Sequence, residues 1–307
     1  MVQEMPSGLT AAPAEDQSFY IFGHNISHSL SPTLHNAGFR ELNFKGRYRI
    51  HESPNVDESV VDLIKQPEFG GASVTFPHKL QIGRHLDRIT AAASAIGAIN
   101  TVVIDRSGPE NRSLIGDNTD WTGIRTCILQ VWEEGMGKSP ALVLGAGGAA
   151  RAACFAIQSL GIREVILVNR TRSTAEKLIA HFPKLRFSYF PALQEITVPN
   201  IGIPPVQVVV GCIPVDQMDE SDIPEKLFSA ATRGVIVEMA YRPLVTPMMQ
   251  VASRYAGWAV FNGTDVLKEQ AYAQFELWTG QKAPSVVMSQ AMQKELEKRE
   301  LHARAQA

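Results

Sequence analysis

The sequence predicts an α/β protein with two domains. The chain has 307 residues, about the length of two ordinary domains. Segments with the two-residue period of strands alternate with segments of helical period. A glycine-rich turn also separates a short apolar run from an alanine-rich stretch near the middle of the chain. Since strands that alternate with helices usually pair in parallel through right-handed crossovers, we expect two α/β units with parallel strands.

The first unit is expected to follow a disordered tail, residues 1–18, which lacks the basic and apolar segments of a secretory signal. Short β-branched and aromatic runs predict its strands, and apolar residues at helical spacing predict its helices. The expected strands are 19–22, 47–51, 71–75 and 98–104, and the expected helices are 34–42, 56–66 and 80–88.

The second unit begins after a turn-rich stretch, residues 135–140. Its expected strands are 141–144, 164–168, 206–210, 234–238 and 258–261, with a helix of small residues at 148–160. Two further helices, 266–280 and 285–299, follow, and nothing in their pattern obliges them to pack on the unit that precedes them.

The composition favours a soluble, cytoplasmic protein with a small-molecule partner. Hydrophobic residues make up 45% and charged residues 20%, and the net charge of −2 is spread along the chain, so neither nucleic acid nor a membrane is an expected partner. No apolar run approaches the roughly 20 residues that cross a bilayer. Three widely spaced cysteines and eight histidines show no metal-ligand spacing, so no metal is expected.

A G-x-G-x-x-A motif, formed by Gly145, Gly147 and Ala150, predicts a Rossmann-type dinucleotide-binding domain. The first glycine permits a tight turn, the second lets the backbone approach a pyrophosphate, and the small third residue allows close packing of helix on strand. Glycine-rich turns also serve packing alone. The expected contacts of the turn are Gly145, Ala146, Gly147, Gly148 and Ala149.

The end of the next strand favours NADP over NAD. An acidic residue there would bind a free ribose 2′-hydroxyl, but the chain has Asn169, Arg170, Thr171 and Arg172. Two guanidinium groups and a hydroxyl suit a 2′-phosphate better. The alternative is a solvated basic loop at a strand end.

Six motifs lie in order along the chain, each in or next to an expected loop. They are 28–32 followed by His35 and Asn36, 73–79, 97–101, 116–120, 238–243, and Gln270 followed by 275–280. Together they resemble the shikimate dehydrogenase family from about Phe19 to Gly280, and most of all a free-standing form of the dehydrogenase module of the five-activity eukaryotic polypeptide of aromatic biosynthesis.

The resemblance implies roles for individual residues. Ser29 and Ser31 would hold the substrate carboxylate, with Tyr241 near it and near the nicotinamide. The ring hydroxyls would bind to Thr75, Asn100, Asp120 and Gln270. Lys79 and Asp120 would form the catalytic pair, since an amine can accept the proton of the reacting alcohol and return it. Met239 and Gly263 would join the cofactor contacts.

The resemblance also implies the domain plan. Residues 19–121 and 265–307 would bind substrate, with the C-terminal helices returning to that domain, and residues 122–264 would bind NADP. The implied activity is reversible reduction of 3-dehydroshikimate to shikimate, by a monomer or homodimer.

Two alternatives stay open. One is a quinate or dual quinate/shikimate dehydrogenase that uses NAD or NADP, and the other is a non-catalytic regulatory or binding protein of the same fold. The chain departs from the family's bacterial pattern at Ser73, where asparagine is usual, and in the cofactor loop 211–214. Taken without the motifs, Lys79 and Asp120 would be read as a surface ion pair of little energetic value.

Overall fold

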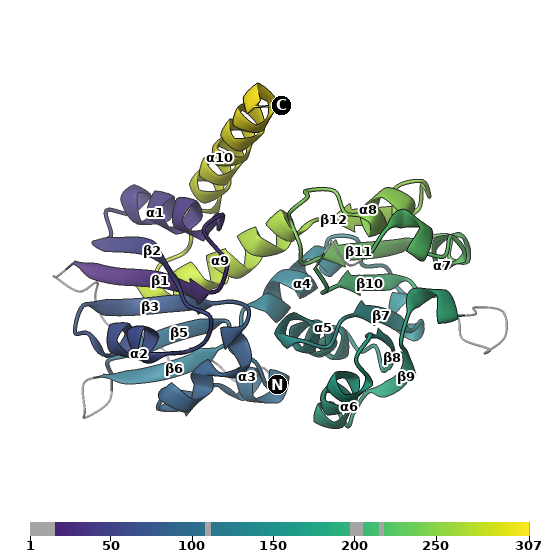
Figure 1. Ribbon diagram of the computed structural model, residues 1–307, viewed down its shortest axis with the longest axis horizontal. Helices are drawn as coiled ribbons and strands as arrows, with labels where there is room; N and C mark the ends of the chain where they lie inside the picture. Colours follow the sequence, from purple (N-terminus) through teal and green to yellow (C-terminus); the bar gives the residue numbers. More distant parts are fainter. Residues whose placement is uncertain (1–15, 108–111, 197–204, 215–217, 307) are drawn as a thin grey trace. The chain divides into compact units, whose positions relative to one another are not determined.

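The computed structural model describes residues 16–107, 112–196, 205–214 and 218–306 and divides into two compact units (Figure 1). Unit 1 holds the residues up to Ser94, Ile99–Thr119, and those from Gln270 onward, and unit 2 holds Ala95–Ala98 and Asp120–Glu269. Most of the expected tail lies outside the described residues. Its last two residues were assigned wrongly, because the first strand already begins at Gln17.

Unit 1 is built on a six-stranded mixed sheet with the order β2-β1-β3-β5-β6-β4. Its strands are β1 (Gln17–Gly23), β2 (Gly46–Glu52), β3 (Phe69–Val74), β4 (Arg88–Ile89), β5 (Thr101–Asp105) and β6 (Ser113–Asp117). β1 runs parallel to β2 and β3, and β4 parallel to β6, but β5 is antiparallel to both neighbours. The expectation of parallel pairing is wrong for β5, because the short strand β6 was not foreseen and follows it closely enough to pair as an antiparallel neighbour.

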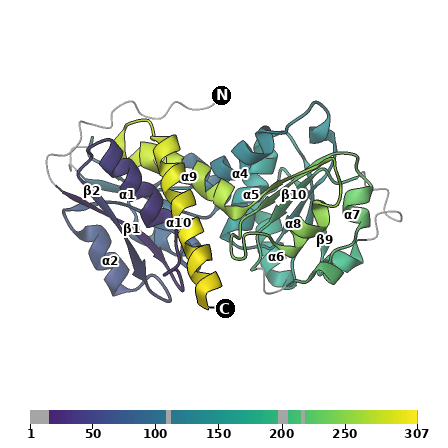
Figure 2. The same ribbon diagram turned by 90° about the horizontal axis from the view of Figure 1, so that it is seen from above.

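The helices of unit 1 include the end of the chain. They are α1 (Ser31–Glu41), α2 (Glu58–Lys65), most of α3 (Ala91–Ile96), the second half of α9 (Gly263–Thr279) and α10 (Ser285–Gln306). α10 packs against α1 (Figure 2). Trp278 of α9 donates a hydrogen bond from Nε1 to the Val102 carbonyl at 2.9 Å. The expected return of the C-terminal helices to this domain is therefore confirmed.

The helix expected at 80–88 does not form. The segment instead contains two single-turn 3₁₀ helices, His78–Leu80 and Ile82–His85, followed by β4. Gly83 disfavours a continuous helix, and Leu80, which completed the apparent apolar stripe, is 53% exposed.

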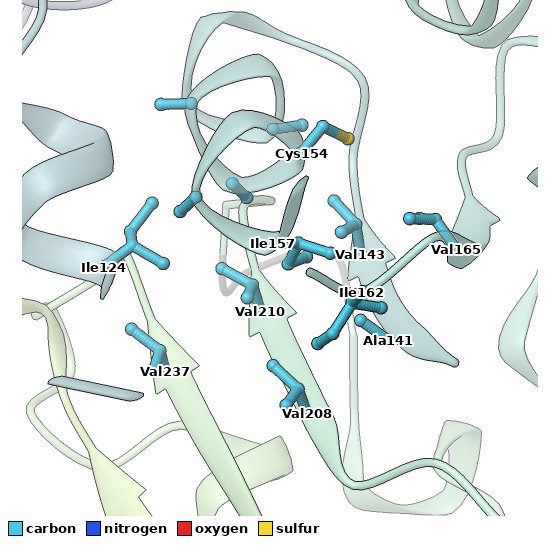
Figure 3. Packing of buried hydrophobic residues seen from close by; sticks show 14 of the residues in the cluster. Ile124, Ala141, Val143, Cys154, Ile157, Ile162, Val165, Val208, Val210 and Val237 are labelled. Carbon is cyan, nitrogen blue, oxygen red and sulfur yellow. The ribbon is translucent and has the colours of Figure 1, made fainter. Parts of the chain in front are cut away.

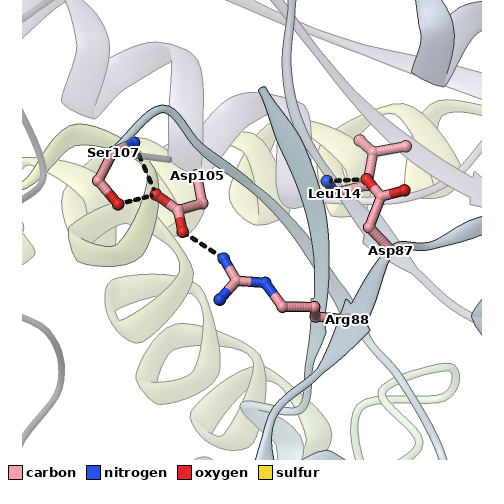
Figure 4. Close-up of polar contacts among 5 residues, drawn as sticks. All are labelled: Asp87, Arg88, Asp105, Ser107 and Leu114. Carbon is pink, nitrogen blue, oxygen red and sulfur yellow. Dashed lines mark hydrogen bonds and ion pairs between the residues drawn. The ribbon is translucent and has the colours of Figure 1, made fainter. Parts of the chain in front are cut away.

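Side-chain contacts at the outer edge of this sheet hold its short strands together (Figure 4). The Asp87 carboxylate accepts the Leu114 N–H at 2.7 Å, which fixes the approach of β4 to β6. Asp105 accepts the N–H and hydroxyl of Ser107 at 2.9 and 2.6 Å and pairs with Arg88, and these hydrogen bonds lower the pKa of Asp105.

Unit 2 has a fully parallel sheet with the order β12-β11-β10-β7-β8-β9. Its strands are β7 (Ala141–Leu144), β8 (Glu164–Val168), β9 (Arg186–Phe190), β10 (Val208–Gly211), β11 (Gly234–Glu238) and β12 (Trp258–Phe261). Its helices are α4 (Asp120–Leu129), α5 (Gly148–Ser159), α6 (Arg172–His181), α7 (Lys226–Ser229) and α8 (Pro247–Ala252). The strand order reverses beside β7, so the sheet has Rossmann topology as expected.

Small side chains on α5 let this helix lie close to the sheet (Figure 3). Cys154 and Ile157 of α5 are fully buried in one cluster with Val143 of β7 and Val210 of β10. Burial raises the pKa of the Cys154 thiol, so this cysteine acts as a small apolar side chain. The close contact fixes where the N-terminus of α5 meets the end of β7.

Candidate functional site

One edge of the unit 1 sheet collects the candidate substrate residues. The parallel strands β1 and β3 end at this edge, and because β5 runs antiparallel, β5 begins there and β6 ends there. The residues at this edge are Ser29 and Ser31 after β1, Thr75 and Lys79 after β3, Asn100 before β5, and Thr119 after β6. We call it the polar edge.

Asn100 is the centre of a buried cluster at the polar edge. Its Nδ2 donates to Gln270 Oε1 at 3.1 Å and lies 3.0 Å from Thr119 Oγ1. Its Oδ1 accepts the Thr119 N–H at 2.7 Å and the Thr101 hydroxyl at 2.6 Å. The fold thus brings together two predicted site residues, Asn100 and Gln270, that are 170 positions apart.

The loop that carries Ser29 and Ser31 is held by side chains from two other elements. Arg299 of α10 donates from Nη1 to the His28 carbonyl at 2.6 Å. Glu52 of β2 accepts the N–H groups of Ile26 and Ser27. Both serines are buried, and the Ser31 N–H donates to Ser29 Oγ at 3.2 Å. The two hydroxyls therefore belong to an anchored loop beside the start of α1.

Lys79 lies half-buried in the first 3₁₀ turn after β3, and its carbonyl accepts the Ile99 N–H at 2.9 Å. The segment of Lys79 is thus bonded to the residue that precedes Asn100. Asp120 follows Thr119 in the chain and is buried at the start of α4, in unit 2. Tyr241 also belongs to unit 2, three residues after β11.

His35, from the first motif, lies in the core of unit 1. Its ring stacks on Tyr48 with centroids 4.7 Å apart, and neither ring nitrogen has a hydrogen-bond partner among the described residues. Burial lowers the pKa of His35 to about 3, and nearby Gln274, outside hydrogen-bonding geometry, offsets this only in part. The ring is therefore neutral at ordinary pH.

The glycine turn of unit 2 has the shape that a phosphate-binding turn needs. Gly145 has φ of 102°, and a Cβ there would lie 2.9 Å from the Cys212 carbonyl oxygen. Gly147 caps α5 with φ of −83°, and a Cβ there would meet nothing within 4 Å. The backbone conformation and packing of the turn require glycine at position 145. Gly147 instead borders open space at the N-terminus of a helix, where anions bind well.

A cavity of about 420 Å³ opens beside this turn, at the carboxyl ends of the parallel strands. Its lining residues stand at the ends of β7 and β8 or in the segments that follow β8, β9 and β10: Leu144, Val168, Asn169, Arg170, Thr171, Pro191, Ala192, Leu193, Gln194, Ile213, Met218 and Asp222. Of the predicted basic cluster, Arg170 lines the cavity. Arg172 instead pairs through Nε with Glu176 at 2.9 Å on the surface of α6.

The other two predicted cofactor residues are packed together, Met239 directly after β11 and Gly263 at the start of α9, after β12. The Gly263 N–H donates to the Ala240 carbonyl at 3.1 Å, and a Cβ on Gly263 would lie 2.6 Å from the Met239 carbonyl oxygen. Beside them, burial raises the pKa of Glu238 to about 7, and the Glu238 carboxylate lies against Gly211 at the end of β10. These contacts fix the loops after β10 and β11 to each other.

Known proteins of similar sequence identify the family. The model of the shikimate dehydrogenase substrate-binding domain matches residues 21–102, and that of the shikimate 5′-dehydrogenase C-terminal domain matches 263–293. The structure of shikimate 5-dehydrogenase from Thermus thermophilus, in complex with NADP(H) and shikimate, is 30% identical, with a TM-score of 0.72 over 91% of this chain and 99% of that one. The chain belongs to the shikimate dehydrogenase family.

The chain is also similar to parts of two longer proteins. The quinate repressor protein of Emericella nidulans is 36% identical over 97% of this chain. The pentafunctional AROM polypeptide of Mycosarcoma maydis is 36% identical over 88% of it. This chain spans only 37% and 18% of the length of these two relatives.

Sequence reasoning missed part of the polar edge. Thr101, Thr119 and Gln274 are as buried as Asn100 and bond to it directly. Thr101 and Thr119 stand inside the motifs 97–101 and 116–120, where they were given no role. Gln274 stands one helical turn after Gln270 and so faces the same side of α9.

Two other features are absent from the described residues. No cluster of three His, Cys, Asp or Glu side chains there could hold a metal ion. None of the described helices is both long and apolar enough to cross a membrane.

The two glycines of the turn should respond differently to substitution. Gly145→Ala should lower the free energy of unfolding by about 2 kcal/mol or more, because alanine is strained at this φ and meets the Cys212 carbonyl. Gly147→Ala should cost about 1 kcal/mol or less, the effect of a poorer helix cap in open space. Urea unfolding of both variants measures this, and equal losses would contradict the distinction.

Proposed function

We propose that this chain is an NADP-dependent shikimate dehydrogenase that reversibly reduces 3-dehydroshikimate to shikimate. Most of the proposed substrate residues belong to unit 1, and the proposed cofactor residues belong to unit 2. The observation that carries the proposal is the buried Asn100–Gln270 amide pair at the polar edge, because paired carboxamides suit the hydroxyl groups of a polyhydroxylated ring.

Two kinds of group hold the substrate in this proposal. The Ser29 and Ser31 hydroxyls bind the carboxylate, while Thr75, Asn100, Asp120 and Gln270 bind the ring hydroxyls. Anchoring by Arg299 and Glu52 supports the first role, since an anchored loop loses little entropy when the substrate arrives. Tyr241 completes the site near the carboxylate.

Lys79 and Asp120 carry the proton chemistry. In the oxidative direction the ring C–H bond breaks with its electron pair while the hydroxyl O–H proton passes to the Lys79 amine, which leaves a ketone. In the reductive direction Lys79 returns the proton to the alkoxide oxygen. Asp120 accepts a substrate hydroxyl and orients the lysine. NADP⁺, when bound, supplies the hydride acceptor.

The turn and cavity of unit 2 fit a phosphorylated dinucleotide. Open space at Gly147 admits a pyrophosphate, and the cavity is wide enough for an adenosine. Asn169, Arg170 and Thr171 line that cavity, where a 2′-phosphate would lie, and Arg172 follows them at the start of α6. The remaining cofactor contacts are Gly145, Ala146, Gly148, Ala149, Met239 and Gly263.

Two other functions have observations in their favour. Quinate differs from shikimate by one added ring hydroxyl, and a dual or quinate-specific enzyme fits the same edge. A non-catalytic regulator is favoured by the likeness to the quinate repressor protein. Calorimetry and a rate assay together separate the classes, because a regulator binds its ligand and turns over neither shikimate nor quinate with either cofactor.

Lys79→Ala should lower kcat for shikimate about 10²–10⁴-fold, the usual contribution of general acid–base catalysis, with a smaller change in KM. Steady-state rates with both substrates saturating measure it. Lys65→Ala, which removes an exposed lysine at the end of α2, is the control and should leave both constants unchanged. Near wild-type turnover by Lys79→Ala would reduce this lysine to a surface ion pair.

Arg170→Ala should raise KM for NADP about 10- to 100-fold and leave KM for NAD nearly unchanged, because a charge-assisted hydrogen bond to the 2′-phosphate is lost. Arg172→Ala should have a smaller effect, since Glu176 already holds its guanidinium. Arg186→Ala, on β9, is the control. A wild-type preference for NAD, or an unchanged NADP constant in Arg170→Ala, would refute the cofactor assignment.

A further inference from the structure

A chain of buried hydrogen bonds runs from Tyr48 on β2 to Asn100 at the polar edge. Tyr48 of β2 lies 2.6 Å through its hydroxyl from Ser73 Oγ of β3, and Ser73 Oγ lies 2.7 Å from Gln274 Oε1 of α9. Gln274 Nε2 lies 3.1 Å from the Asn100 carbonyl and 2.9 Å from Thr101 Oγ1. Gln274 has no exposed surface.

The chemistry of the groups decides which atom donates and which accepts in each of these bonds. The Asn100 carbonyl can only accept, so the Gln274 atom beside it is the NH₂ group and Oε1 faces Ser73. Ser73 then gives its single proton to Gln274, and Tyr48 must donate to Ser73. The bonds are therefore polarised in one direction, from Tyr48 toward Asn100.

The same reasoning fixes the Asn100 side chain. Thr101 Oγ1 receives a proton from Gln274 and passes its own to Asn100 Oδ1 at 2.6 Å. The Thr119 N–H, which can only donate, reaches the same oxygen at 2.7 Å. With two donors on Oδ1, the Nδ2 group must face Gln270. A flipped amide would set NH₂ against the Thr119 N–H and leave buried groups unpaired.

We propose that Gln274 is a positioning residue that, with Ser73 and Tyr48, sets the orientation of the Asn100 amide for the substrate ring. This inference rests on the proposed function. Gln274 acts through Asn100 and Thr101 and not by touching the substrate itself. Whether a ring hydroxyl meets a donor or an acceptor at Asn100 is then decided by side chains on β2, β3 and α9.

Shikimate binding to Gln274→Met tests this role, because methionine keeps the length of the side chain and removes every hydrogen bond. We expect the Kd for shikimate, measured by calorimetry, to rise about tenfold or more while the Kd for NADP stays unchanged. In an Asn100→Ala background the same substitution should change the shikimate Kd less than twofold, since Gln274 then has no amide to orient.

Thr279→Val is the matched control. Thr279 is a buried polar residue of α9, and its hydroxyl bonds at the end of this helix to the Phe275 and Gln281 carbonyls and to the Gln281 N–H. None of these bonds belongs to the chain of bonds from Tyr48 to Asn100. The substitution should lower stability without changing the shikimate Kd. Ser73→Ala, a smaller change that removes the donor to Gln274, should raise the Kd about threefold or more and serves if Gln274→Met does not fold.

The outcomes separate the two proposals. If wild-type protein binds shikimate and Gln274→Met, or Ser73→Ala in its place, binds it equally well, the positioning role is refuted and the proposed function stands. An equal loss in the Asn100→Ala background refutes it too, because a general structural effect would persist there. Wild-type protein that neither binds nor oxidises shikimate refutes the proposed function and this role with it.

Discussion

The orientation of one buried amide, that of Asn100, is the constraint on which the polar edge depends. A carboxamide without solvent contact needs partners for its oxygen and its NH₂ group, and each unpaired group costs about 1–3 kcal/mol. Asn100 finds them on β5, after β6 and on α9. These bonds hold only if β5 keeps its antiparallel register and α9 returns to unit 1, so the mixed sheet and the C-terminal helices serve the same site.

Unit 2 forms its candidate phosphate-binding turn with small residues and not with polar ones. Gly145 turns the chain at a φ that other residues rarely adopt, and alanines on α5 let the helix approach the sheet. The result is a helix N-terminus beside open space at the point where the strand order reverses. Arg170 adds charge at the next strand end, within a cavity that the neighbouring loops enclose.

The sequence predicted those elements whose signals are local. β7, β8, β11 and β12 have the expected bounds, because buried parallel strands read as short apolar runs between turns. β6 was missed, since only two of its five residues are buried and its pairing with β5 is decided by the fold. The apolar residues at 80–88 have a helical spacing, but no α-helix forms there, because Gly83 disfavours a continuous helix and the Leu80 side chain is exposed to solvent.

The candidate site shows the same difference between local sequence signals and contacts that only the fold decides. The motifs pointed to Asn100, Gln270, Lys79 and the glycine turn, because the residues that carry a family resemblance stand in short segments of sequence. The partners Tyr48, Ser73 and Gln274 could not be inferred as one chain of bonds, since their contacts join segments 25 and 201 positions apart. Arg172 looked equivalent to Arg170 in sequence. The structure shows that Arg172 begins α6 and forms an ion pair with Glu176 one turn later.

The most direct test is the initial rate of cofactor reduction by the purified chain, with shikimate or quinate as substrate and NADP or NAD as oxidant. The account predicts that kcat/KM is highest for shikimate with NADP. It is contradicted if quinate with NAD is the preferred pair, or if none of the four combinations gives a rate above the protein-free control.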